Sequence, residues 1–258
     1  KHTTATYFRF SPVSLAMLER KVDLVLIPGI NNTSDLWSPV TAALPDWVNC
    51  IPVDCAPLDS VRQIAEQLLD DLPETFCLLG FSFGGYVALE MISLAPERIN
   101  GLILVNTNAT DDSEIQLRAR RQAAITAEQG GYEELSASLS DKVFHPTSLT
   151  NPVIMAERKR MTAAYGAERY IAHQYASMDR ADHRKLLASL QLPVLVIGAT
   201  DDQIMKEKDQ MRMAESVPQC TYESVRDAGH MLPMEKPNTI ANHIENWMTS
   251  IYLAVSAE

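Results

Sequence analysis

Cysteine is scarce in this chain of 258 residues. The four cysteines are Cys50, Cys55, Cys77 and Cys220, and no two of them have CxxC spacing. We therefore expect neither a disulfide framework nor a cysteine-based metal site, and a cytoplasmic setting is the simpler interpretation. The chain begins with Lys1 rather than Met, which leaves open whether a leader segment was removed before it.

Long apolar runs and an excess of positive charge are also missing. The apolar run Val22–Ile27 is interrupted by Asp23 and is far shorter than the roughly 20 residues of a membrane span. The chain has 22 Lys and Arg against 33 Asp and Glu, so its net charge is −11. We expect neither a membrane nor a nucleic acid as the main partner, and the sequence leaves the oligomeric state open.

Motifs that hold cofactors are absent as well. The sequence contains no P-loop, no GxGxxG fingerprint, and no HExxH or EF-hand spacing. We therefore expect no cofactor and no metal ion, and a small molecule as the partner.

Short apolar runs alternate with longer helical patterns along the chain. The runs that predict strands are Val22–Ile27, Val48–Val53, Thr75–Leu79, Ile99–Val105, Val194–Ile197 and Thr221–Val225. The patterns that predict helices are Asp59–Asp71, Phe83–Leu94, Lys206–Ser216 and Pro237–Ile251. This alternation predicts an α/β fold, a mostly parallel twisted sheet with helices on both faces. Thr6–Leu18 could add weak edge strands.

The stretch from residue 111 to residue 185 breaks the alternation. It has no strand-like run, and breaks such as Gly130-Gly131 predict three to five short helices. It carries 11 basic and 11 acidic residues, so the rest of the chain accounts for the whole net charge. We expect a helical cap at 111–185, inserted between core parts at 1–110 and 186–258. Its basic clusters are expected on solvated faces paired with the acidic core, and contact with an anionic part of the substrate is the alternative; they are Arg118, Arg120 and Arg121, and Arg158, Lys159 and Arg160. His173 either packs or faces the pocket.

The sequence Gly80-Phe81-Ser82-Phe83-Gly84 follows a predicted strand and opens a predicted helix. Glycines two residues on either side of a serine permit a tight turn in which the hydroxyl projects above the edge of the sheet. This context favours Ser82 as a nucleophile over a bystander in a glycine-rich turn.

A serine hydroxyl needs a base, and the base needs an anionic partner. His230 follows the strand Thr221–Val225, whereas the other five histidines have no strand-end context. Asp201 and Asp202 follow the strand Val194–Ile197, and Asp111 or Asp112 after Val105 are further candidates for the acid. Since carboxyl ends of parallel strands share one edge, these groups are expected to meet.

These motifs resemble the α/β-hydrolase superfamily over nearly the whole chain. The matching pieces are Leu26–Gly29 through Trp37, the turn at Ser82, Pro96-Glu97-Arg98, Gly198 with Asp201, and Gly229-His230 leading to Glu235-Lys236-Pro237. The resemblance implies Asp201 as the acid, because it stands three residues after Gly198, and Asp202 as a solvated neighbour. It also implies an oxyanion hole formed by the main-chain N–H groups of Ile30 and Phe83. The chain departs from the family in having Pro28-Gly29 where His-Gly is common.

The likeness is to small esterases, enol-lactonases and carbon–carbon hydrolases with a helical cap. It implies a serine hydrolase that cleaves a small carboxylic ester or lactone through an acyl-enzyme, with Ser82, Asp201 and His230 as the triad. Trp37 and Phe83 are expected to line the substrate pocket. Three alternatives stay open: carbon–carbon bond cleavage by the same triad, acyl transfer to an alcohol or thiol, and a non-catalytic ligand-binding protein that kept the fold.

Overall fold

One parallel sheet forms the centre of the computed structural model, which describes residues 21–254. Its strands are β1 Val22–Ile27, β2 Val48–Pro52, β3 Phe76–Phe81, β4 Ile99–Val105, β5 Val194–Ala199 and β6 Cys220–Val225. They lie in the order β2-β1-β3-β4-β5-β6, and every neighbouring pair is parallel. The predicted mostly parallel sheet is confirmed. The expected edge strands at Thr6–Leu18 lie outside the described residues.

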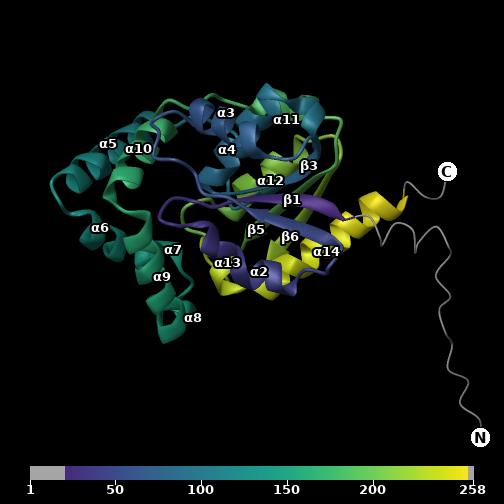
Figure 1. Ribbon diagram of the computed structural model, residues 1–258. Coiled ribbons are helices and arrows are strands. Elements are labelled where there is room, and N and C mark those ends of the chain that lie inside the picture. The colour runs from purple at the N-terminus through teal and green to yellow at the C-terminus, as the bar shows by residue number, and fades with distance from the viewer. Residues whose placement is uncertain (1–20, 255–258) are drawn as a thin grey trace, which may run out of the picture.

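Helices cover both faces of the sheet (Figure 1). The helices of one layer are α3 Val61–Asp71, α4 Phe83–Leu94 and α12 Glu207–Glu215, and those of the other are α2 Ser38–Ala43 and α14 Pro237–Ala254. Side chains alternate between the two cores along each strand, because successive residues of a strand point to opposite faces. In β3, Phe76 and Leu78 belong to the core under α3 and α4, whereas Cys77 and Leu79 belong to the core under α2 and α14.

Every regular element between β4 and β5 is a helix. They are α5 Glu114–Glu128, α6 Tyr132–Ser138, α7 Ser140–Val143, α8 Pro146–Leu149, α9 Pro152–Tyr165, α10 Ala167–Met178 and α11 Arg184–Ser189. There are more of them than the predicted three to five, since α7 and α8 are four-residue turns too short to leave a periodic pattern. Helices α5–α10 lie at one end of the sheet, remote from the described ends of the chain (Figure 1).

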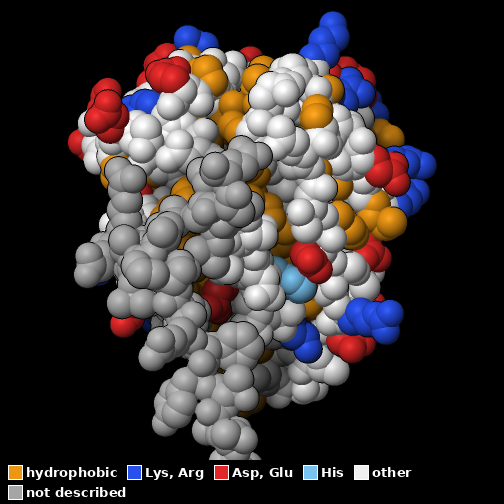
Figure 2. Space-filling view, turned by 90° about the vertical axis from the view of Figure 1, so that its right-hand side faces the viewer, with side chains coloured by type: hydrophobic (Ala, Val, Ile, Leu, Met, Phe, Trp, Pro, Cys, Tyr) orange, Lys and Arg blue, Asp and Glu red, His pale blue; other side chains and the backbone are white. Residues whose placement is uncertain are grey.

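The opposite end of the molecule is shown in Figure 2, where acidic and basic side chains are interspersed among apolar ones on the visible described surface. No helix in residues 21–254 combines the length and the apolar character that a membrane crossing requires.

Candidate active site

A sharp turn between β3 and α4 holds Ser82 in a strained conformation. Its φ of 52° is positive, which is uncommon for a residue other than glycine. A Cβ on Gly80 would overlap the Gly84 carbonyl oxygen, and a Cβ on Gly84 would overlap the Ile27 carbonyl oxygen. The turn is fixed from the end of β4, since the Ser82 N–H donates to Val105 O at 3.0 Å. These close approaches explain why glycines flank the serine.

Ser82, His230 and Asp202 form one line of hydrogen bonds. Ser82 Oγ lies 2.9 Å from His230 Nε2, and His230 Nδ1 lies 2.8 Å from Asp202 Oδ2. A carboxylate can only accept, so the proton is on Nδ1 and Nε2 is left to accept from the serine hydroxyl. The side chain of Asp202 is fully buried and that of His230 is 8% exposed, so the hydrogen bond between them is shielded from water, whereas Ser82 is half-buried.

The prediction of Asp201 as the partner of His230 was wrong. Asp201 is exposed, and its carboxylate accepts from the neighbouring Thr200 hydroxyl. Strand β5 runs two residues beyond its predicted end, so the following turn places Asp201 at its tip. Asp202 turns back toward the sheet, where its Oδ1 accepts from the N–H groups of Ile204 at 2.7 Å and Met205 at 2.8 Å. Such an Asx turn is typical of Asp, but two adjacent aspartates give the sequence no way to choose.

Asn106, which the sequence analysis missed, holds two of these segments together. It lies fully buried directly after β4 with a φ of 41°. Its Oδ1 accepts from the N–H of Ala199 at 3.0 Å, at the end of the strand that leads to Asp202. Its Nδ2 donates to the carbonyl oxygen of His230 at 3.0 Å. Asn106 therefore fixes the segments of the acid and the base relative to each other. An asparagine at a strand end is the available signal, and it is a weak one.

The loop after β1 lies against the serine. A Cβ on Gly29 would come within 3.2 Å of Ser82 Cβ, which puts the Gly29–Ile30 peptide beside the nucleophile turn. The side chain of Asn32 donates to the carbonyl oxygen of Ile30 at 2.8 Å, and Asn31 Oδ1 lies 3.0 Å from the hydroxyl of Tyr132 on α6. The loop is thus held from within and from the helices between β4 and β5.

Phe83 is the first residue of α4, and the first N–H groups of a helix have no partner within it. The main-chain N–H groups of Phe83 and Ile30 thus belong to the two segments next to the serine. These are the two positions that the sequence analysis expects to form an oxyanion hole.

The two predicted pocket residues lie in different cores. Trp37 is fully buried beneath Phe81, with its ring edge-to-face and the ring centres 6.4 Å apart. The ring of Phe83 is stacked at 4.5 Å on the ring of His173 from α10. Phe83 therefore joins the nucleophile turn to the helices between β4 and β5. Contact with a substrate stays a prediction for both Trp37 and Phe83.

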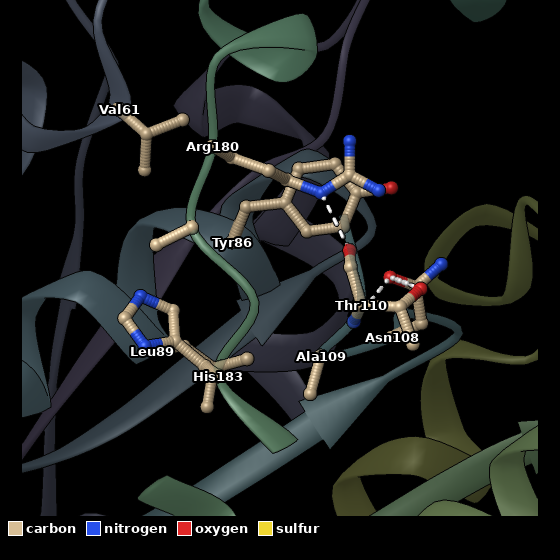
Figure 3. Close-up of a pocket in the computed structure, with 9 residues that line it drawn as sticks. Val61, Tyr86, Leu89, Asn108, Ala109, Thr110, Arg180 and His183 are labelled. Atoms are coloured by element: carbon tan, nitrogen blue, oxygen red, sulfur yellow. Dashed lines mark hydrogen bonds between the residues drawn. The ribbon is translucent and has the colours of Figure 1, made fainter. Parts of the chain in front are cut away.

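A separate shallow pocket lies beside α4 (Figure 3). Arg180 crosses it, with its guanidinium 4.0 Å from the centre of the Tyr86 ring and its Nε donating to Thr110 O at 2.9 Å. None of the triad candidates Ser82, Asp202 and His230 lines this pocket. Residues 21–254 also contain no group of three or more His, Cys, Asp or Glu side chains that could hold a metal ion.

Comparison with known proteins identifies the family. Over 197 residues the chain is 28% identical to 3-oxoadipate enol-lactonase 2 from Acinetobacter baylyi, across 75% of this chain and 72% of that protein. A solved esterase from Thermogutta terrifontis superposes with a TM-score of 0.83 at 24% identity, covering 90% of this chain and 91% of its own. An enol-lactonase from Burkholderia xenovorans superposes with a TM-score of 0.81 at 20% identity, covering 89% and 92%. Residues 24–243 match the sequence profile of the alpha/beta hydrolase family. The chain therefore belongs to the alpha/beta hydrolase family of enzymes.

Proposed function

We propose that this enzyme is a serine hydrolase that cleaves a small carboxylic ester or lactone. The observation that carries the proposal is the line from Ser82 through His230 to Asp202, with heavy-atom distances of 2.9 and 2.8 Å. These distances are within the range in which a base takes a proton from a nucleophile. Similarity to a protein named enol-lactonase supports the same class of substrate.

In the proposed reaction, Ser82 Oγ attacks the carbonyl carbon while His230 Nε2 takes the hydroxyl proton. The buried carboxylate of Asp202 stabilises the imidazolium that forms. His230 then protonates the leaving alkoxide, or in a lactone the ring oxygen, which leaves an acyl group on Ser82. A water molecule that gives a proton to His230 attacks this acyl group; the bond to Ser82 Oγ then breaks, His230 returns the proton to Oγ, and the acid is released.

The developing negative charge on the carbonyl oxygen needs donors. The N–H groups of Phe83 and Ile30 are the proposed pair, because both belong to segments that lie against Ser82. Main-chain donors fixed before the reaction are often worth a few kcal/mol of the barrier. The Pro28-Gly29 sequence does not remove such a donor, because the N–H belongs to Ile30.

We further propose that residues 111–185 act as a cap over this site, in keeping with the stacking of His173 on Phe83. A cytoplasmic setting is also proposed, on the ground that the four cysteines of the sequence are sparse and have no CxxC spacing.

The test is the Ser82→Ala variant. We expect turnover of p-nitrophenyl acetate to fall by about 10⁴-fold or more and labelling by a fluorophosphonate probe to be lost. The control is Ser216→Ala at the end of α12, an exposed serine that is expected to leave both signals unchanged. Labelling of the Ser82→Ala variant at the wild-type level would contradict the assignment of the nucleophile.

A further inference from the structure

Arg158 on α9 is a buried side chain in which two of the three guanidinium nitrogens lack a partner among the described residues. Arg158 is 7% exposed, and its Nε and Nη1 atoms are buried with no hydrogen-bond acceptor among the described residues. The adjacent acid, Glu157, pairs instead with Arg160 at 2.6 Å. A guanidinium keeps its charge in proteins, and leaving it dry and unpaired is strongly unfavourable. The fold therefore keeps an arginine where it lowers the stability of the free protein.

The surroundings of Arg158 are aromatic rather than acidic. The phenols of Tyr132 and Tyr170, whose ring centres lie 5.1 Å apart, lie near its charge, and no carboxylate of the described residues accepts from its Nε or Nη1. Neutral phenols cannot balance a positive charge. An anion that enters this region would meet a cation whose Nε and Nη1 lack acceptors.

The aromatic cluster that contains Tyr132 and Tyr170 also contacts the loop next to the active site. The Tyr132 hydroxyl lies 2.8 Å from the carbonyl oxygen of Thr162, one turn after Arg158 on α9, and 3.0 Å from Asn31 Oδ1. Asn31 follows Ile30, whose N–H is the proposed oxyanion donor. The Ile30 side chain itself packs against the aromatic cluster that contains Tyr132 and Tyr170. Tyr132 therefore connects α9, the helix that carries Arg158, to the loop beside the nucleophile turn.

We propose that Arg158 binds a carboxylate carried by the substrate, at the end remote from the bond that Ser82 cleaves. This inference rests on the proposed hydrolase function and narrows its substrate to an anionic ester or lactone. Charge supports it: the molecule carries −11 overall, whereas residues 111–185 are neutral, so an anion is repelled least where Arg158 lies. A carboxylate supplies both the opposite charge and the acceptors that the guanidinium lacks.

The first experiment uses p-nitrophenyl half-esters of succinate, glutarate and adipate, each paired with the neutral ester of the same chain length. We expect wild type to favour the anionic member of at least one pair by roughly 10- to 100-fold in kcat/KM. Arg158→Met should abolish this preference, measured as the ratio of kcat/KM for the anionic ester to that for its neutral partner, and Arg158→Lys should retain part of it. The matched control is Arg160→Met on the same helix, whose side chain is 51% exposed.

Thermal unfolding separates a binding role from a structural one. If Arg158 is kept for a ligand, Arg158→Met should raise Tm in the absence of ligand, because it removes an unpaired buried charge. A lower Tm together with an unchanged preference between the paired esters would overturn the proposal.

Binding of free glutarate and adipate to the Ser82→Ala variant distinguishes failure of this inference from failure of the proposed function. Calorimetric binding that disappears in Ser82→Ala with Arg158→Met would support the anion site even if no ester were hydrolysed. If both members of every pair are hydrolysed, and the ratio of their kcat/KM values is the same in wild type and in Arg158→Met, the role of Arg158 is refuted and the proposed hydrolase function is not. If wild type hydrolyses none of the esters and the Ser82→Ala variant binds neither glutarate nor adipate, both the proposed function and the role of Arg158 are refuted.

Discussion

The hydrogen bond from His230 to Asp202 determines which nitrogen of the imidazole carries the proton. In Asp202→Asn the amide can donate to Nδ1, which moves the proton to Nε2 and leaves no acceptor for Ser82. We expect kcat for p-nitrophenyl acetate to fall by about 10³- to 10⁴-fold while the fold is retained. Asp201→Asn changes an exposed carboxylate next to it in sequence and should alter kcat by less than about twofold. A larger loss in Asp201→Asn than in Asp202→Asn would reverse the assignment.

Asp201 and Asp202 also show how much of the site could be predicted from the sequence. Ser82 and His230 could be predicted because each follows a strand and lies near glycine, and the ends of parallel strands meet at one edge of the sheet. Asp201 and Asp202 differ only in how the turn after β5 closes, which depends on N–H groups two and three residues further on. Spacing counted from Gly198 does not contain that information.

The carboxylate of Glu235, at the end of α13 (Leu232–Glu235), connects two segments that are distant in the sequence. Its Oε1 accepts from the Gly229 N–H at 2.9 Å, next to His230. Its Oε2 accepts from the His145 N–H at 2.9 Å and from the Ser148 hydroxyl on α8 at 2.5 Å. One side chain therefore ties the loop of the base to the helices between β4 and β5.

Glu235→Gln replaces one acceptor oxygen with a donor that faces other donors. We expect the free energy of unfolding to fall by roughly 1–3 kcal/mol and kcat to fall more than KM rises, because His230 loses its fixed position. Hydrogen exchange should quicken at residues 143–150 and 229–231 together. Glu245→Gln on α14 is the control. Faster exchange in only one of the two segments would contradict a connecting role.

Helix geometry also explains why the sequence could not separate Arg158 from its basic neighbours. Arg158, Lys159 and Arg160 form one basic run, for which a solvated face was expected. On α9, Arg160 is indeed half-exposed and pairs with Glu157, but Arg158, two residues earlier, lies on the buried side. The strands were predictable because parallel strands are apolar throughout, as in β3 and β5. Helix α9 carries no comparable signal, because its buried residues include Arg158 and Thr162 as well as Met161 and Tyr165.

His173 on α10 joins the helices between β4 and β5 to the core of the molecule. The ring is completely buried. Its Nε2 lies 2.7 Å from the carbonyl oxygen of Ala56, which can only accept, so Nε2 carries the proton and Nδ1 accepts from the Tyr165 hydroxyl. Its face stacks on Phe83, next to the nucleophile. Protonation of Nδ1 would put a charge into this contact and disrupt the bond to Tyr165.

Burial lowers the pKa of His173 to about 4, whereas an unfolded histidine has a pKa of about 6.5. Between these values the unfolded chain binds the proton more readily, so the stabilisation is fully present above about pH 6.5 and is lost as pH falls toward 4. We expect His173 to account for up to about 3 kcal/mol of the loss in unfolding free energy over this window. Urea unfolding of wild type and His173→Gln at pH 7 and pH 4 measures it. The variant starts less stable but should lose less on acidification, since carboxylates common to both proteins cancel in the difference. Equal losses in the two proteins would show that His173 has the same pKa in the folded and the unfolded chain, which contradicts a neutral, buried ring as the link between the helices and the core.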